Sequence, residues 1–227
     1  MKRFVRMMVL DLREMSFGRF FPTVSVVLLT VFAAVSFIGT PFPEMDAQSR
    51  IYMFQRLAPV FSAWWVIMLF HSCVEDDGAE AFYSYCYSRK ILGIGRIAAL
   101  TVIFVALLML SGIAFLSVGI IRFDQLLPFV LILSVQSLFF ESAGYLIIMA
   151  VRNMMWSFSA ILLLSYINIW GFPGIGQYLN IEIDISGGMG MGQILPKLTV
   201  IAVLSAILAV IAQRLFDNYR FRPMKKK

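Results

Sequence analysis

Residues 75–96 read EDDGAEAFYSYCYSRKILGIGR and form the largest charged island within the hydrophobic part of this chain. Four carboxylates stand among its first six residues, three tyrosines follow, and Ser88, Arg89 and Lys90 lead into the next apolar run. Acidic side chains near a helix start oppose the positive end of the helix dipole. The pattern therefore predicts a short amphipathic helix that continues into a membrane-spanning helix.

The composition places this island in a membrane protein. Of 227 residues, 60% are hydrophobic and 14% are charged, whereas a soluble domain averages about 45–50% apolar and about 25% charged residues. The length fits a single membrane domain over residues 1–227. The fold class predicted from sequence is therefore an all-α integral membrane protein.

Six apolar stretches are long enough, or nearly so, to cross a hydrocarbon core of about 30 Å. Residues 1–19 mix basic and apolar side chains at helical spacing, which predicts an interfacial amphipathic helix in the lipid headgroup layer. Between the last two stretches lies a glycine-rich segment, Gly171–Lys197. The predicted spans are residues 20–38, 52–71, 97–119, 127–149, 154–170 and 198–213.

The connections between these spans carry most of the remaining charge. We expect Arg50 in the loop before the second span and Arg56 in the first turns of that span, and Arg122 and Asp124 in the link before the fourth. Arg152 and Asn153 are expected to form a turn before the fifth span.

The distribution of lysine and arginine predicts the orientation. Six spans place both termini on one side, together with residues 74–96 and the Arg152 turn. Of the 19 Lys and Arg residues, 15 lie on that side. Because cytoplasmic loops carry the excess of basic residues, both termini are expected to be cytosolic in a multi-pass protein of the cell membrane. The opposite side holds only Arg50, Arg56, Arg122 and Lys197.

Covalent catalysis has no evident machinery in this sequence. There is no GxxxxGK[ST] phosphate loop and no GxSxG motif, and the one histidine, His71, lacks a second histidine at ligand spacing. Cys73 and Cys86 are too isolated for a zinc site and are expected to be unpaired thiols. We therefore expect no enzyme activity, no metal and no cofactor on this chain.

Chemistry alone leaves two interpretations of the island open. Tyrosine anchors protein interfaces well, so the island is a plausible docking helix for another protein. It is equally plausible as a solvated loop whose tyrosines lie at the headgroup level of the bilayer.

The run resembles the cytosolic loop between the second and third spans of type-2 ABC exporter permeases. In that family an acidic stretch, a glycine, a glutamate, apolar residues, a proline and a Ser-Arg pair recur before the third span. Here the acidic–glycine part is Glu75–Glu80, and Tyr83–Arg89 supplies the rest, with Cys86 where proline is usual. Ile91, Leu92, Gly95 and Arg96 continue the pattern. The resemblance also implies a helix-broken outer segment between the fifth and sixth spans, which the stretch from Gly171 to Pro196 matches.

The resemblance implies an assembly of several subunits. Two permeases, identical or paralogous, would form a dimer bound to cytosolic ABC ATPase subunits that carry ATP and Mg, with no nucleic acid involved. Residues 74–96 would be the coupling loop, and the substrate is expected to be lipophilic or amphipathic, such as an antimicrobial peptide or a drug. The residues expected to couple to the ATPase are Glu75, Asp76, Asp77, Gly78, Glu80, Phe82, Tyr83, Tyr85 and Arg89.

Glu141 is the second feature of interest, because it lies midway along the fourth predicted span. A charge there costs about 2.5–3.5 kcal/mol on insertion scales. Helical spacing places Ser134, Ser137 and Tyr145 on the same face. This stripe could line a translocation pathway, or it could provide polar contacts between helices.

Two further possibilities remain open from the sequence. Ser165 and Asn168 lie three residues apart on the fifth span and could form a similar polar patch. The alternative function is an ion-coupled secondary carrier or channel that uses Glu141 and needs no ATPase partner.

Overall fold

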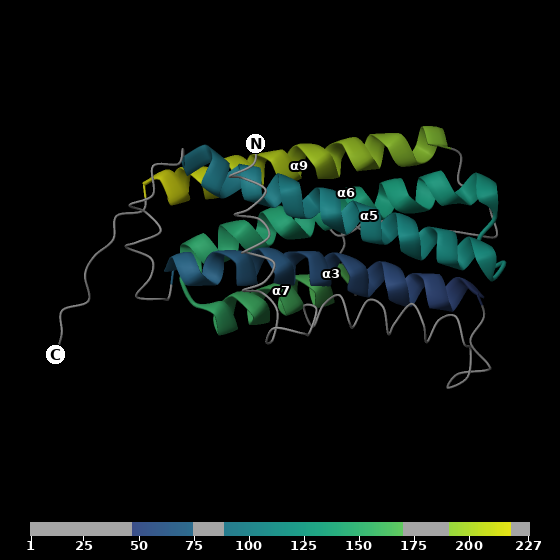
Figure 1. The fold of residues 1–227 in the computed structure, drawn as a ribbon, viewed down its shortest axis with the longest axis horizontal. Helices are drawn as coiled ribbons and strands as arrows, with labels where there is room; N and C mark the ends of the chain where they lie inside the picture. The colour runs from purple at the N-terminus through teal and green to yellow at the C-terminus, as the bar shows by residue number, and fades with distance from the viewer. Residues whose placement is uncertain (1–46, 75–88, 170–190, 219–227) are drawn as a thin grey trace.

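The computed structural model describes residues 47–74, 89–169 and 191–218, and these ranges are helical apart from short turns (Figure 1). Within them no strand occurs, which confirms the predicted all-α class for this part of the chain. A π-helical turn, η1, runs directly into α5. The elements are α3 (Ala47–Val74), η1 (Ile91–Gly95), α5 (Arg96–Ser117), α6 (Phe123–Val151), α7 (Met154–Ile169) and α9 (Met191–Asp217).

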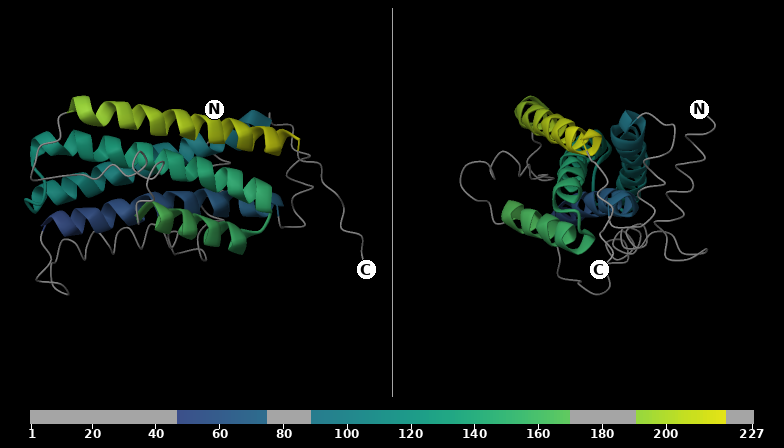
Figure 2. Two further views of the ribbon diagram at one scale, coloured as in Figure 1. Left: turned by 180° about the vertical axis from the view of Figure 1, so that it is seen from behind. Right: turned by 90° about the vertical axis from the view of Figure 1, so that its left-hand side faces the viewer.

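The helices form a bundle around α6, which packs against α3, α5, α7 and α9 (Figure 2). Consecutive helices run in opposite directions. The last turn of α3, the start of η1, and the last turns of α6 and α9 therefore meet at one end of the bundle, on the left in Figure 1. We call this the 74/89 end, because residues 75–88 connect its Val74 to its Arg89.

Among the described residues, four helices are long and apolar enough to cross a membrane. The segments are Gln48–His71, Ile91–Ser117, Phe123–Val151 and Ile194–Asp217. The shortest have 24 residues, which corresponds to about 36 Å at 1.5 Å per residue and exceeds a hydrocarbon core of about 30 Å. Several apolar helices of this length indicate a multi-pass membrane protein.

The prediction of six spans is tested only in part. Helix α7 corresponds to the fifth predicted span and has 16 described residues, which is short for a full crossing. The first predicted span, residues 20–38, lies outside the described residues. So do the predicted interfacial helix, residues 1–19, and most of the coupling loop, residues 75–88.

The helices extend further than their apolar cores predicted. Helix α3 begins at Ala47 and takes in Arg50, which was expected in a loop. Helix α6 begins at Phe123 and holds Asp124 in its first turn. A charged side chain near a helix end can reach water while its backbone hydrogen bonds stay within the helix. The position of the charged residues in the sequence therefore did not predict where these two helices begin.

Pro196 is inside α9, although a break through Pro196 was expected. The helix begins at Met191, so the proline stands in its second turn. A proline there removes a single backbone donor close to the helix start, and membrane helices tolerate such a loss. The Arg152 turn, in contrast, is confirmed: Arg152 is left-handed with φ of 58°, and Asn153 Oδ1 accepts from the Trp156 N–H at 3.0 Å to start α7.

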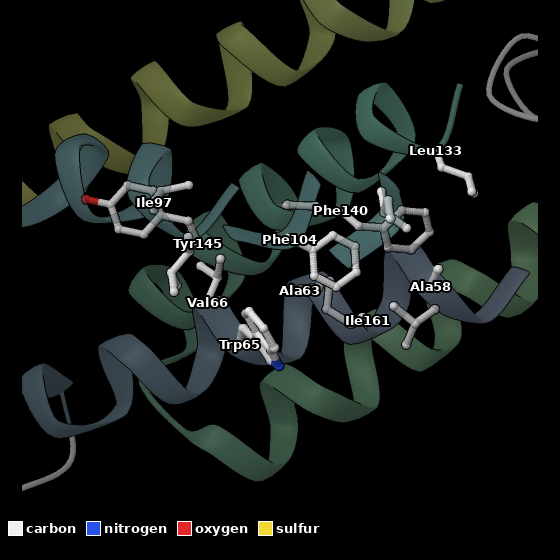
Figure 3. Packing of buried hydrophobic residues seen from close by; sticks show 14 of the residues in the cluster. Ala58, Ala63, Trp65, Val66, Ile97, Phe104, Leu133, Phe140, Tyr145 and Ile161 are labelled. Atoms are coloured by element: carbon white, nitrogen blue, oxygen red, sulfur yellow. The ribbon is translucent and has the colours of Figure 1, made fainter. Parts of the chain in front are cut away.

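The core lies where α3, α5 and α6 meet. Trp65 of α3 meets Phe104 of α5 edge to face, with ring centroids 5.6 Å apart (Figure 3). Gly144 of α6 lies so close to Ala63 that an added Cβ would be 3.2 Å from the Ala63 carbonyl oxygen. Close approach through small residues is a usual way for membrane helices to associate.

Candidate functional site

The 74/89 end is organised around the side-chain amide of Gln213, near the end of α9. Its Oε1 accepts from the Ile94 backbone N–H at 3.0 Å and from the Tyr145 hydroxyl at 3.2 Å. Its Nε2 donates to the Arg89 carbonyl at 3.3 Å and to Asp217 Oδ1 at 2.8 Å. The two donors and two acceptor positions of the amide are thus all used. We call these five residues the Gln213 cluster.

Gly93 makes room for this amide. A Cβ at Gly93 would lie 2.0 Å from Gln213 Oε1 and 2.7 Å from the Tyr145 hydroxyl oxygen. Only a residue without a side chain therefore fits beside the cluster. Tyr145 belongs otherwise to the apolar core, and its hydroxyl oxygen lies at the edge of the buried cluster (Figure 3).

Arg89 joins the start of η1 to the end of α9. Its guanidinium Nη1 donates to the Asp217 backbone carbonyl. The last carbonyls of a helix have no partner within the helix and carry the negative end of its dipole, so an arginine is a favourable cap there. Arg89, predicted as a coupling residue, therefore has a defined contact within the bundle.

Arg96 joins the start of α5 to the last turn of α3. Although charged, it is only 2% exposed. Its Nη1 lies 3.7 Å from Cys73 Sγ, and its guanidinium carbon lies 5.7 Å from the centre of the Phe70 ring. Phe70 in turn stacks on Tyr145, with centroids 4.5 Å apart, and meets Phe216 at 5.9 Å. These rings tie α3, α6 and α9 together beneath the polar contacts.

Both flanks of residues 75–88 are thus held by the bundle. Arg96 holds the flank that ends at Val74, and the Gln213 cluster holds the flank that begins at Arg89. The other predicted coupling residues lie outside the described part of the chain: Glu75, Asp76, Asp77, Gly78, Glu80, Phe82, Tyr83 and Tyr85.

Glu141 is buried between helices, with 1% of its surface exposed. Its Oε2 lies within hydrogen-bond distance of Thr101 Oγ1 on α5. Thr101 Oγ1 is also 3.0 Å from the Ile97 carbonyl oxygen. In the described chain, Glu141 therefore makes a polar contact between α5 and α6.

The residues predicted to share a face with Glu141 have different hydrogen-bond partners in the structure. Ser134 Oγ donates to the Val130 carbonyl at 2.7 Å within α6. Ser137 is fully buried, and its carbonyl accepts from Ser62 of α3 at 3.2 Å. Tyr145 joins the Gln213 cluster instead. The polar stripe is thus divided into separate contacts: Ser134 bonds within α6, whereas Ser137 and Tyr145 contact other helices.

The predicted patch on the fifth span is partly described. Ser165 is 8% exposed and lies on the buried side of α7. Asn168 is in the last turn of α7, and its side chain lies outside the described part. Among the residues described, no group of three or more His, Cys, Asp or Glu could hold a metal ion.

The sequence analysis missed four polar residues that make contacts between helices. Thr101 contacts Glu141, Gln55 donates to Gln136 at 3.2 Å between α3 and α6, and Gln213 builds the cluster at the 74/89 end. The available signal was their position: each is an isolated polar side chain within an apolar helix, where it needs a partner. Gly93 gave a second signal, as a glycine just before the third predicted span.

No family model, curated protein or solved structure matches the chain. Its membership of the type-2 ABC exporter permeases therefore stays a prediction, and its function is inferred from its own residues.

Proposed function

We propose that this chain is the transmembrane permease subunit of an ATP-driven ABC exporter. In this proposal two permeases form the translocation pathway, and separate cytosolic ATPase subunits bind residues 75–88 and supply the energy. The observation that carries it is the attachment of both flanks of this acidic, tyrosine-rich segment to the interior of the bundle. A docking element needs such attachments if movement of its partner is to reach the membrane helices.

The contacts at the 74/89 end provide a physical route for that movement. Arg89 contacts α9 directly, and Gln213 contacts both η1 and Tyr145 of α6. On the other flank, Arg96 contacts the last turn of α3. A displacement of residues 75–88 would therefore act on α3, α5, α6 and α9 at once, because packed interiors transmit strain.

The charge distribution supports a cytosolic position for the 74/89 end. Arg89, Lys90, Arg152 and Arg214 lie there, and the sequence after α9 holds five more basic residues among positions 219–227. By the positive-inside rule, this excess of basic residues favours the side where ATP and an ATPase are present.

Glu141 fits a structural contact better than a transport site. The ion-coupled alternative requires Glu141 to exchange an ion with the pathway. In the described chain it is buried and bonded to Thr101 across two helices, which is how membrane bundles use polar side chains. We propose that transport is driven through the 74/89 end instead.

The substrate proposed is a lipophilic or amphipathic compound, such as an antimicrobial peptide or a drug. This part of the proposal rests on the sequence, in which the predicted outer loops are too small for a receptor domain.

The experiment is to reconstitute the permease with its ATPase in liposomes and to measure ATP hydrolysis and transport together. Glu80→Lys and Gly78→Pro are expected to separate the two, with ATP hydrolysis no longer producing transport while membrane insertion stays intact. Asp124→Lys is the matched control, because Asp124 is a carboxylate 70% exposed at the opposite end of the bundle. Unchanged transport and unchanged ATPase binding in Glu80→Lys would contradict the proposal.

A further inference from the structure

Just before the third predicted span the helix contains an irregular turn, η1, that is held by a side chain from another helix. In η1 the backbone bonds run five residues back, whereas in the adjoining α-helix they run four residues back. A change from one pattern to the other leaves one N–H group without a backbone carbonyl. Such a buried donor needs another partner, and the Ile94 N–H finds it in Gln213 Oε1 at 3.0 Å.

The same amide also contacts the backbone on the other side of the turn. Gln213 Nε2 donates to the carbonyl of Arg89, which is five residues before Ile94. The Gln213 side chain of α9 is therefore inserted between the Ile94 N–H of η1 and the carbonyl of Arg89, which lies just before η1, five residues back. Insertion of a side chain into the backbone ladder is a known cause of helix irregularity.

We propose that Gln213 is a removable wedge, and that its withdrawal converts η1 into regular α-helix. After withdrawal the Ile94 N–H would donate to the Lys90 carbonyl, four residues back. Arg89 and Lys90 would then turn about the helix axis by about 100° relative to α5 and move along it by about 1.5 Å, which is the geometry of one α-helical residue. The device is thus a two-position switch at the point where residues 75–88 join the bundle.

Three features favour two alternative positions over a fixed contact. Glycine at 93 has little preference for one backbone conformation, which lowers the cost of the irregular turn. Asp217 lies one turn beyond Gln213 on the same helix, so the bond to Asp217 Oδ1 can persist after the amide leaves η1. Both states also satisfy the Ile94 N–H, with Gln213 in one and with Lys90 in the other.

The role of the switch in transmitting movement from an ATPase rests on the proposed function. The equilibrium between the two conformations of η1 does not, because it depends only on residues of this bundle. It can therefore be tested on the purified full chain in lipid nanodiscs with no ATPase present, so that failure of the switch and failure of the proposed function are separate results.

The test compares two ways of removing the wedge. Gly93→Ala places a methyl group 2.0 Å from Gln213 Oε1 and 2.7 Å from the Tyr145 hydroxyl oxygen. The amide is the end of a flexible side chain and can move away, which relieves the shorter of the two contacts. Gln213→Leu removes the amide and keeps an apolar side chain of similar size. Gly95→Ala is the matched control, because it adds the same methyl group two residues later and meets only ordinary contacts, the nearest at 3.6 Å from the Lys90 carbonyl oxygen.

The readout is the distance between two spin labels attached through introduced keto amino acids, which leaves the cysteines in place. One pair joins position 90, before the turn, to position 151 at the end of α6. The second pair joins position 102, beyond the turn, to position 151. Lys90, Val102 and Val151 are all exposed, so each tolerates a label.

We expect Gly93→Ala and Gln213→Leu to shift the distance distribution of the 90–151 pair in the same way. Gly95→Ala should give the wild-type distribution, and the 102–151 pair should not change in any variant. If either wedge variant keeps its helical content and thermal unfolding midpoint but retains the wild-type 90–151 distribution, the switch is excluded. Loss of folding in both would also overturn the proposal, because Gln213 would then be a fixed structural contact.

Discussion

One hydroxyl proton in the middle of the bundle constrains the protonation of Glu141. Thr101 Oγ1 lies within hydrogen-bond distance of both the Ile97 carbonyl and the Glu141 carboxyl, yet a hydroxyl can donate only once. Both contacts are filled if Glu141 is the neutral acid and donates to Thr101, while Thr101 donates to Ile97. A neutral carboxyl also avoids the cost of a buried charge.

Glu141→Gln is therefore expected to leave the stability unchanged, because the amide keeps a donor for Thr101. Thr101→Val should lower the free energy of unfolding by about 0.6 to 1.7 kcal/mol, the range of hydrogen bonds between membrane helices. Reversible unfolding in mixed micelles measures both. Thr199→Val is the control, since Thr199 makes the same bond within its own helix, to the Leu195 carbonyl at 2.9 Å, and is exposed. A large loss in Glu141→Gln would show that the carboxylate is ionised and paired.

Arg96 is expected to be the most sensitive basic residue of the described chain. It is buried against Phe70 and Cys73, so Arg96→Ala removes both packing and a charged contact. We expect a loss of at least about 2 kcal/mol in the free energy of unfolding. Arg96→Lys should not restore it, because lysine lacks the planar group that stacks on an aromatic ring.

The control for Arg96 is Arg214→Ala, at the same end of the bundle but on an exposed position. Its effect should stay within about 0.5 kcal/mol. If the two substitutions had equal effects on the free energy of unfolding, the buried contacts of Arg96 would not stabilise the 74/89 end.

At the scale of helices, the packing of α3 on α6 depends on Gly144. A side chain there would meet the Ala63 carbonyl oxygen and, at 3.5 Å, the Ala63 Cα. These are backbone atoms, which move only with the whole helix. Gly144→Val should therefore cost about 1–3 kcal/mol through overpacking, as measured by unfolding in micelles. Ala150→Val, an exposed position on the same helix, should have little effect.

The sequence predicted the helices well and their ends less well. Apolar runs located α3, α5, α6, α7 and α9, because a helix in lipid must be apolar along its length. The ends were wrong at Arg50, Asp124 and Pro196, since charged residues at a helix end can reach water and an early proline removes a single bond.

The sequence predicted the location of the candidate site but not the contacts that form it. The charged island marked where the 74/89 end lies, but the partners of Arg89 are more than a hundred residues away in the sequence, on α9. Such pairings depend on which helix packs beside which, and the apolar pattern of a helix does not specify its neighbour. An isolated glutamine in an apolar helix, such as Gln213, predicts that a hydrogen-bond partner exists but does not identify the partner residue.

At the scale of the whole molecule, the described part of the chain is a bundle of apolar helices whose 74/89 end holds a cluster of polar contacts between helices. That end collects the flanks of residues 75–88 and ties them to α3, α6 and α9. The arrangement suits a membrane protein that is moved by a partner at one face, and it gives the acidic, tyrosine-rich segment a mechanical connection to the helices.

The most direct test of this account is site-specific photo-cross-linking in native membranes from an unnatural residue at position 80, with position 124 as the control at the opposite end. The account predicts that position 80 cross-links to a subunit that carries a GxxxxGK[ST] phosphate loop and that position 124 does not. If position 80 is accessible only from outside the cell, or cross-links to no such subunit, the proposed coupling to an ATPase is wrong.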